Sequence, residues 1–242
     1  MVRSPAADMA PSLAYPPLCP NPFSAKTAII VSQAYKTLLY WSREGGKLME
    51  IWLVRHGETD WNAEGRVQGW TDVPLNARGR QQASQLAQCL RSISFAHIYA
   101  SDLTRALDTA RIVADAVGAP ITPLACLREH RFGQAEGLLR QESDRRFPNG
   151  APDREPPEAL QARVTQCLQD IAKRHAEGRV LIATHGGVIR SILNWLGHSH
   201  PPIANTSITR LRARANGFDI LGVNETPHLD GGSAMELISQ HR

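Results

Sequence analysis

The chain has 242 residues, enough for one large domain or two small ones with a substantial buried core. Hydrophobic residues make up 42% and charged residues 21%, which is ordinary for a globular protein. No apolar run approaches the roughly 20 residues that cross a bilayer, so no membrane span is expected. The net charge of +4 lies mostly in residues 1–48, with five basic against two acidic side chains, while residues 49–242 have 22 against 21. Without a basic run interleaved with aromatics, we expect no nucleic-acid partner.

Residues 1–25 contain six prolines together with alanine and serine, a composition that favours an unstructured or extended segment. Residues 27–42 could form one amphipathic helix, but they lie too far from the start for a good secretory signal. Residues 44–47, Glu-Gly-Gly-Lys, require a purine-rich coding stretch just upstream of the Met49 codon, like a bacterial ribosome-binding site. We therefore expect residues 1–48 to be an extension that is disordered or not translated in the cell, and residues 49–242 to form the folded domain.

The four cysteines match neither a CxxC pair nor a zinc pattern, so reduced thiols and a cytoplasmic location are expected. They are Cys19, Cys89, Cys126 and Cys167. The nine histidines form no HExxH cluster, and His198 and His200 are interpreted as ordinary loop residues. We expect no metal.

The first predicted strand is the apolar run at residues 51–54. Further apolar runs predict strands at residues 97–100, 121–124 and 180–183, and alternation predicts a final hairpin at residues 206–213 and 218–223.

Apolar residues at three- and four-residue spacing predict four helices. These lie at residues 77–91, 101–117, 157–175 and 187–196. Asn76 and Ser101 are the expected N-caps of the first two. Residues 127–157 lack a clean period and are interpreted as an active-site loop with room for a short helix. Strands alternating with helices predict one α/β domain with helices on both faces of the sheet.

Two of the predicted strands end in His-Gly, at residues 54–57 (Val-Arg-His-Gly) and 183–186 (Ala-Thr-His-Gly). Ligands of open α/β sheets bind at the carboxyl ends of strands. Arginine supplies a planar fork of donors and histidine a nucleophilic nitrogen, so this pairing indicates a phosphate site. The helix N-termini expected at Ser101 and Gly187 offer further N–H groups to an anion.

A longer pattern surrounds the first strand end. Residues 55–62 read Arg-His-Gly-Glu-Thr-Asp-Trp-Asn, residues 67–75 read Val-Gln-Gly-Trp-Thr-Asp-Val-Pro-Leu, and Gly79 follows. This pattern resembles the histidine phosphatase superfamily, also called phosphoglycerate mutase-like, over roughly four-fifths of the chain. The resemblance implies a single three-layer domain with a mostly parallel central sheet and a small phosphate ester as substrate. Because family members are often dimers, it also makes a homodimer an expectation.

The resemblance implies catalytic roles for five residues. His56 attacks phosphorus in line and becomes phosphohistidine, while Arg55, Arg105 and His185 neutralise and orient the phosphate oxygens. Glu129, in a Leu-Arg-Glu string, protonates the leaving group and then activates water. From the residues alone, the favoured interpretations are different: a helical arginine such as Arg105 is usually solvated, and Glu129 would be a surface carboxylate paired with Arg128 or Arg131.

Other positions match the family with less specific motifs. The Asn62 side chain and the Gly186 amide match positions that hold phosphate oxygens, and Gln68 and Gly69 match substrate-side positions. Ala135 departs from the family, since many members have tryptophan there, and this weakens any inference about pocket shape.

Arg145 and Arg146 are read in two ways: they bind a substrate carboxylate or second phosphate, or they form a solvated basic pair.

Three functions fit this set. The first is a phosphatase, in which water takes the phosphate from His56. The second is a phosphoglycerate mutase, which returns the phosphate to the substrate and would need 2,3-bisphosphoglycerate as primer; otherwise no cofactor is expected. A mutase must exclude water, typically under a longer lid than residues 138–156 provide. The third, a non-catalytic phosphate-binding module, is disfavoured because nucleophile and acid are both present.

Overall fold

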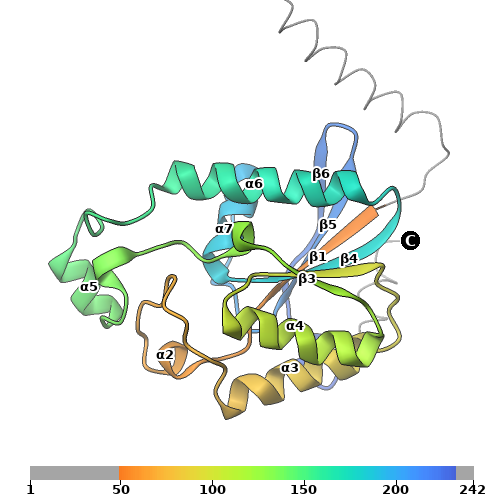
Figure 1. The fold of residues 1–242 in the computed structure, drawn as a ribbon, viewed down its shortest axis with the longest axis horizontal. Helices are drawn as coiled ribbons and strands as arrows, with labels where there is room; N and C mark the ends of the chain where they lie inside the picture. The colour runs from red at the N-terminus through yellow and green to blue at the C-terminus, as the bar shows by residue number, and fades with distance from the viewer. Residues whose placement is uncertain (1–48, 233–242) are drawn as a thin grey trace, which may run out of the picture. The chain divides into compact units, whose positions relative to one another are not determined.

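The computed structural model describes residues 49–232 (Figure 1). The predicted extension at residues 1–48 and the last ten residues, 233–242, lie outside this range, so a native start at Met49 stays a prediction.

The central sheet has six strands in the order β3-β2-β4-β1-β5-β6. They are β1 (Met49–Arg55), β2 (His97–Ala100), β3 (Ile121–Pro123), β4 (Gly178–Thr184), β5 (Ile208–Arg214) and β6 (Gly217–Glu225). The four strands from β3 to β1 are parallel, and β5 and β6 add an antiparallel edge. The mostly parallel sheet and the final hairpin predicted from the sequence are confirmed.

The register of β1 and β4 positions the site. The two strands pair from Met49 opposite Gly178 to Arg55 opposite Thr184. Both strands then leave the sheet, and each is followed directly by His-Gly. The two His-Gly segments, more than a hundred residues apart in the chain, therefore begin side by side.

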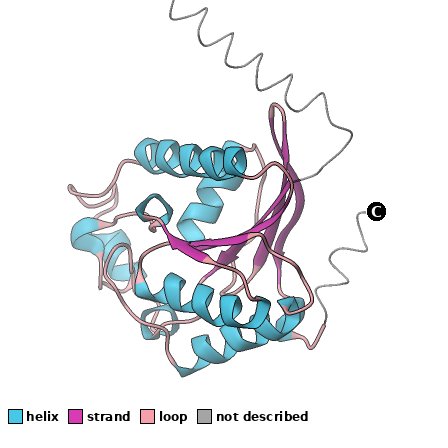
Figure 2. Ribbon diagram, turned by 45° about the vertical axis from the view of Figure 1, so that its right-hand side comes forward, coloured by secondary structure: helices cyan, strands magenta, loops and turns pink. Residues whose placement is uncertain are grey.

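Six α-helices are described, together with three single turns of 3₁₀ helix. The α-helices are α2 (Asp60–Ala63), α3 (Ala77–Leu90), α4 (Thr104–Val117), α5 (Arg140–Arg146), α6 (Pro157–Arg174) and α7 (Gly186–Trp195). The 3₁₀ turns are η1 (Ala125–Leu127), η2 (Gly133–Ala135) and η3 (Pro227–Leu229). Helices α3 and α4 cover one face of the sheet and α6 and α7 the other (Figures 1 and 2). The predicted three layers are confirmed.

The core between the sheet and the α3–α4 pair follows the predicted apolar stripes. Leu86, Leu90 and Val113 from the helices pack with Trp52 of β1, and all four are fully buried. The predicted N-cap of α3 is also confirmed, because the Asn76 side chain accepts a hydrogen bond from the Gly79 N–H at 2.8 Å.

The helix after β2 begins three residues later than predicted. Ser101 is not its cap, because the Ser101 hydroxyl bonds the ring of His185 at 2.8 Å and accepts from the Leu103 N–H at 3.3 Å. The first N–H of α4, that of Thr104, donates to the carboxylate of Asp72 at 2.8 Å. An acidic side chain from a distant loop therefore takes the capping position.

Glycine is required at residues 57 and 79 because two backbone segments lie in direct contact there. Gly57 does not have a positive φ. A Cβ on Gly57 would instead collide with the backbone of Gly79, and one on Gly79 would collide with the backbone of Glu58. The two glycines let the loop after β1 cross the start of α3 at backbone contact.

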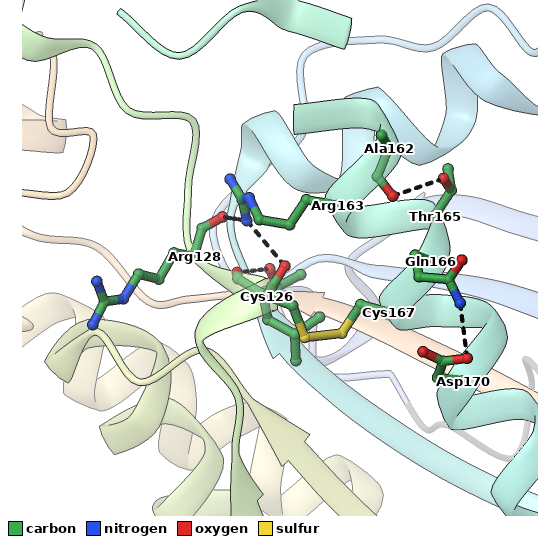
Figure 3. The surroundings of a disulfide bond; sticks show 10 residues. Cys126, Arg128, Ala162, Arg163, Thr165, Gln166, Cys167 and Asp170 are labelled. Carbon is green, nitrogen blue, oxygen red and sulfur yellow. Dashed lines mark hydrogen bonds between the residues drawn. A yellow bond between two sulfur atoms is a disulfide. The ribbon is translucent and has the colours of Figure 1, made fainter. Parts of the chain in front are cut away.

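Cys126 and Cys167 form a disulfide that joins η1 to α6 (Figure 3). Their Cα atoms are 6.1 Å apart, within the range that a disulfide spans. The expectation of reduced thiols is wrong for this pair, since spacing in sequence says nothing about partners brought together by folding. The cytoplasmic location stays a prediction.

No helix within residues 49–232 is long and apolar enough to cross a membrane.

Reducing this disulfide is expected to lower stability. The bond closes a loop with a sequence separation of 41 residues, for which loop-closure entropy contributes about 4 kcal/mol to the free energy of unfolding. Thermal unfolding with and without reductant measures the loss, and the double variant Cys126→Ser, Cys167→Ser should not respond to reductant. Peptide mapping without reduction should recover the two cysteines in one linked fragment; recovery of both as separately alkylated peptides would contradict the pairing.

Candidate active site

The imidazoles of His56 and His185 lie together at the carboxyl edge of the sheet. Their ring centroids are 5.2 Å apart, and both side chains are buried. This separation is small enough for one tetrahedral anion to contact both rings. The structure therefore brings together the two His-Gly segments that the sequence singled out.

His56 is held as the tautomer that a nucleophile needs. Its Nδ1 lies 2.7 Å from the carbonyl oxygen of Gly57, and a carbonyl only accepts, so Nδ1 carries the hydrogen. Nε2 is then the nitrogen with a free lone pair. Burial, followed by the positive charges of Arg105 and Arg55, lowers the pKa of His56 well below its ordinary value of 6.5. The ring is therefore neutral near pH 7.

Two arginines flank this ring and are held by backbone carbonyls. Arg55, the last residue of β1, donates from Nη1 to the Ile203 oxygen at 2.6 Å. Arg105, in the first turn of α4, donates to the Thr71 and Gly69 oxygens at 2.9 and 2.7 Å. Arg105 is fully buried, which excludes the solvated-arginine reading. Burial lowers the pKa of Arg55 to about 10, opposed by Glu129, so both guanidiniums stay charged near pH 7.

Buried nitrogens without a protein partner are concentrated here. Five side-chain nitrogens of the described residues are buried and form no hydrogen bond within the protein. Three of them belong to this site, namely the Nε atoms of Arg55 and Arg105 and the Nδ1 atom of His185, and the other two are Arg212 Nε and His228 Nδ1. Since an unsatisfied buried donor costs roughly 1–3 kcal/mol, three in one place indicate a site for an anion that accepts hydrogen bonds.

The carboxylate of Glu129 lies against the start of α7. Its Oε2 accepts from the Gly187 N–H at 3.0 Å and its Oε1 from the His130 N–H at 2.8 Å. Its charge also acts on both Arg55 and Arg105, which places it near the anion site.

The alternative reading of Glu129 was a surface carboxylate paired with a neighbouring arginine. The structure does not support it for Arg128, which instead forms two hydrogen bonds with Asp102, both at 2.7 Å.

The other predicted ligand residues are Asn62, Gln68, Gly69 and Gly186, and three of them contact residues of the site or of its loops. Asn62 ends a capping box with Thr59, and its Oδ1 also accepts from Asn205 at 3.3 Å, so its amide nitrogen is the end left to donate to a ligand. Gln68 accepts from the Thr59 hydroxyl at 3.0 Å. Gly69 contributes its carbonyl to Arg105. Gly186 is the first residue of α7, so its N–H has no acceptor within the helix.

Arg145 and Arg146 lie at the end of α5 and are exposed. The Arg146 guanidinium lies over the Phe147 ring, 5.3 Å from its centroid. Neither arginine has a described contact with His56, His185 or Glu129, so their substrate role stays a prediction.

Two supporting residues, Thr109 and Asn205, were not predicted, and Ser101 supports the site in a different way from the predicted cap. The Ser101 hydroxyl bonds Nε2 of His185, which leaves Nδ1 without a partner in the protein. The Thr109 hydroxyl accepts from the Gly57 N–H at 3.1 Å, and the Asn205 amide donates to the His56 oxygen at 2.9 Å. Their only sequence signal is that they are polar residues inside apolar segments or beside a strand.

Glu136 joins two loops of the site. Its carboxylate accepts from the N–H groups of Trp70, Thr71 and Phe132 at 3.1, 2.9 and 2.9 Å. The loop that receives Arg105 is thus tied to the loop that carries Glu129. These contacts give Glu136 a structural role in the site.

Within the described residues no group of three or more His, Cys, Asp or Glu side chains is arranged to hold a metal ion.

Comparison with known proteins identifies the class. The family model of the histidine phosphatase superfamily (branch 1) matches residues 51–226, and the chain belongs to this family. Among curated relatives, the "Probable phosphoglycerate mutase GpmB" of Enterobacter sp. (strain 638) is 37% identical over 202 residues, covering 78% of this chain and 92% of the relative. The "Uncharacterized phosphatase PhoE" of Bacillus subtilis (strain 168) is 32% identical and covers 75% and 97%.

Among solved structures, Bacillus stearothermophilus YhfR superposes with a TM-score of 0.70 at 32% identity, covering 75% of this chain and 99% of that one.

The His56 ring is expected to stay neutral through mildly acidic pH. In ¹⁵N NMR spectra its nitrogens should keep the pattern of the Nδ1–H tautomer as pH falls through 6.5, because burial and two cations oppose protonation. The His56→Ala variant assigns the signals. In the unfolded chain the ring does bind a proton near pH 6.5, so protein stability should decrease as pH falls below that value. A midpoint at 6.5 in the folded protein would contradict this.

Gly187→Ala is expected to displace the Glu129 carboxylate, because a Cβ at residue 187 would collide with its Oε1. A misplacement of about 1 Å can cost on the order of 10²-fold in rate, so hydrolysis of an alkyl phosphate should fall by that order. An unchanged rate in Gly187→Ala would contradict the role of Gly187.

Proposed function

We propose that this protein is a phosphatase that hydrolyses small phosphate monoesters through a phosphohistidine on His56. The observation that carries the proposal is the cluster of three buried nitrogens, on Arg55, Arg105 and His185, that have no partner in the protein and lie around a neutral imidazole. A phosphoryl group supplies the negative oxygens that such donors require.

In the first step Nε2 of His56 attacks phosphorus in line, and the bond from phosphorus to the ester oxygen breaks. The charges of Arg55 and Arg105 stabilise the developing negative charge on the transferring oxygens. The leaving alkoxide takes a proton from Glu129, which must enter this step as the acid. The products are a phosphohistidine and an alcohol.

In the second step Glu129, now a carboxylate, takes a proton from water. The water oxygen attacks phosphorus, the bond from phosphorus to Nε2 breaks, and inorganic phosphate leaves. Glu129 is restored as the acid and His56 as the neutral base. Glu129 is only partly buried, which supports access of water to the intermediate.

The competing activity is a phosphoglycerate mutase, as the name of one relative suggests. A mutase must keep water from the phosphohistidine. The segment proposed to act as a lid, between η2 and α6, contains only one short helix, α5. This favours hydrolysis.

One assay separates these activities. The protein is incubated with p-nitrophenyl phosphate, and with 3-phosphoglycerate in the presence and absence of 2,3-bisphosphoglycerate. We expect release of inorganic phosphate, unchanged by EDTA; formation of 2-phosphoglycerate would instead identify a mutase, and neither product would leave a binding module. His56→Ala should abolish the activity and the acid-labile phosphoenzyme, whereas His198→Ala, an exposed loop histidine, should retain both.

A further inference from the structure

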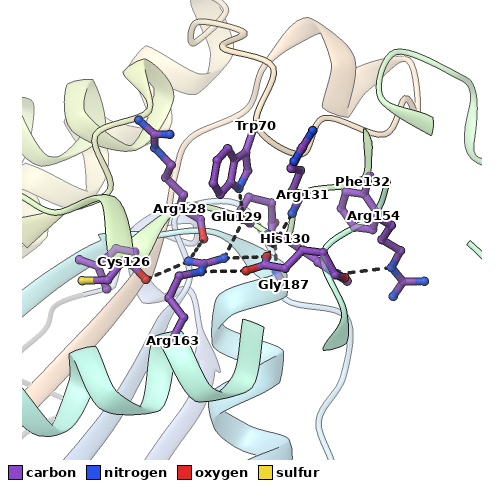
Figure 4. A network of polar contacts seen from close by, with 12 residues as sticks. Trp70, Cys126, Arg128, Glu129, His130, Arg131, Phe132, Arg154, Arg163 and Gly187 are labelled. Carbon is purple, nitrogen blue, oxygen red and sulfur yellow. Dashed lines mark hydrogen bonds and ion pairs between the residues drawn. The ribbon is translucent and has the colours of Figure 1, made fainter. Parts of the chain in front are cut away.

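Arg163 of α6 uses every hydrogen-bond donor of its guanidinium, and most of its partners lie around Glu129 (Figure 4). Nη1 donates to the carbonyl oxygens of Cys126 and Arg128, both at 2.9 Å. Nη2 donates to the Glu129 carbonyl at 3.3 Å and to Glu155 Oε2 at 2.8 Å, and Nε donates to Glu155 Oε1 at 3.0 Å. Five N–H groups therefore make five bonds, three of them to one short segment of backbone.

The peptide of Glu129 is held from two sides. Its carbonyl also accepts from the Trp70 indole at 2.7 Å. With this carbonyl fixed, the Glu129 carboxylate that contacts Gly187 can move only by rotation of the Glu129 side chain. The position of the backbone at residues 126–129 therefore determines which positions the Glu129 carboxylate can reach.

Glu155 extends this support to the far side of Glu129. Burial alone would raise the pKa of Glu155, but the hydrogen bonds and charge of Arg163 outweigh it and lower the pKa, so the pair stays ionic. The Glu155 carbonyl accepts from the His130 ring at 2.6 Å, and its carboxylate from the Arg131 N–H at 3.3 Å. The residues on both sides of Glu129 are therefore tied, directly or through Glu155, to one guanidinium.

We propose that Arg163 is a positioning residue: by binding the carbonyls of residues 126, 128 and 129 it sets the Glu129 carboxylate where it can protonate the leaving group. This rests on the proposed function, because it assumes that Glu129 is the acid. Arg163 does not act by charge alone, since a lysine would keep the charge but offers three donors without the planar fork.

The dependence of rate on the leaving group isolates this role. An alkoxide needs a proton as it leaves, whereas 2,4-dinitrophenolate leaves without one. For Arg163→Ala, kcat/KM for glycerol 2-phosphate should fall by about 10- to 100-fold, while kcat/KM for 2,4-dinitrophenyl phosphate should change by less than about threefold. Arg163→Lys should show the same selective loss. A lysine variant with the full rate on the alkyl ester, or equal losses on both esters, would overturn the proposal.

A double-variant cycle links the effect to Glu129. Glu129→Gln should show the selective loss by itself, and adding Arg163→Ala to it should cause no further selective loss. Arg174→Ala is the matched control, because Arg174 is an exposed arginine on the same helix, and it should leave both rates unchanged.

The two proposals fail in different ways. If the wild-type protein releases no phosphate, or Glu129→Gln shows no dependence on the leaving group, the proposed function fails. If Glu129→Gln is selective but the Arg163 variants are not, or if the two selective losses multiply in the double variant, only the positioning role fails. If Arg163→Ala does not fold, Arg163→Lys decides by the same ratio of rates.

Discussion

The parallel pairing of β1 with β4 is the constraint on which the site depends. Arg55 and Thr184, the last residues of the two strands, lie opposite each other, and a histidine follows each of them. The two histidine rings therefore lie side by side, with their centroids 5.2 Å apart. A shift of register would separate the rings along the sheet edge. Neighbouring parallel strands end on the same side of a sheet, so the pairing of β1 with β4 is enough to bring together two short sequences that lie far apart in the chain.

The site gathers two positive charges that nearby carboxylates offset only in part. Arg55 and Arg105 are held largely by backbone carbonyls, which orient a guanidinium without cancelling its charge. Burial then keeps both imidazoles neutral and lowers the pKa of both arginines. Such an arrangement is unfavourable by itself and becomes favourable when an anion enters, which is what electrostatic preorganisation for phosphoryl transfer requires.

Glu129 is held in a different way from the two histidines, which directly follow strands of the sheet. Its loop carries no regular structure longer than one turn, so its position comes from contacts with elements around it: Gly187 of α7, the Trp70 indole and Arg163 of α6. The disulfide attaches the same loop to α6 one turn beyond Arg163, at Cys167. A carboxylate on an irregular loop, such as the acid proposed here, can be placed accurately when the groups that hold it stand on regular elements.

The sequence by itself determined the parts of this protein that depend on local periodicity and on a specific motif. The strands, the four longest helices, the Asn76 cap and the family follow from patterns within short windows of residues, whereas α2 was not predicted. The Asp72 cap of α4, the Cys126–Cys167 disulfide and the bonds of Arg163 were decided only by the tertiary structure. Apart from Glu155, which lies eight residues before Arg163, the partners are more than 30 residues apart, and a side chain that bonds across such a distance has no periodic signal. Local physics selects the elements, whereas only their packing selects which polar groups meet.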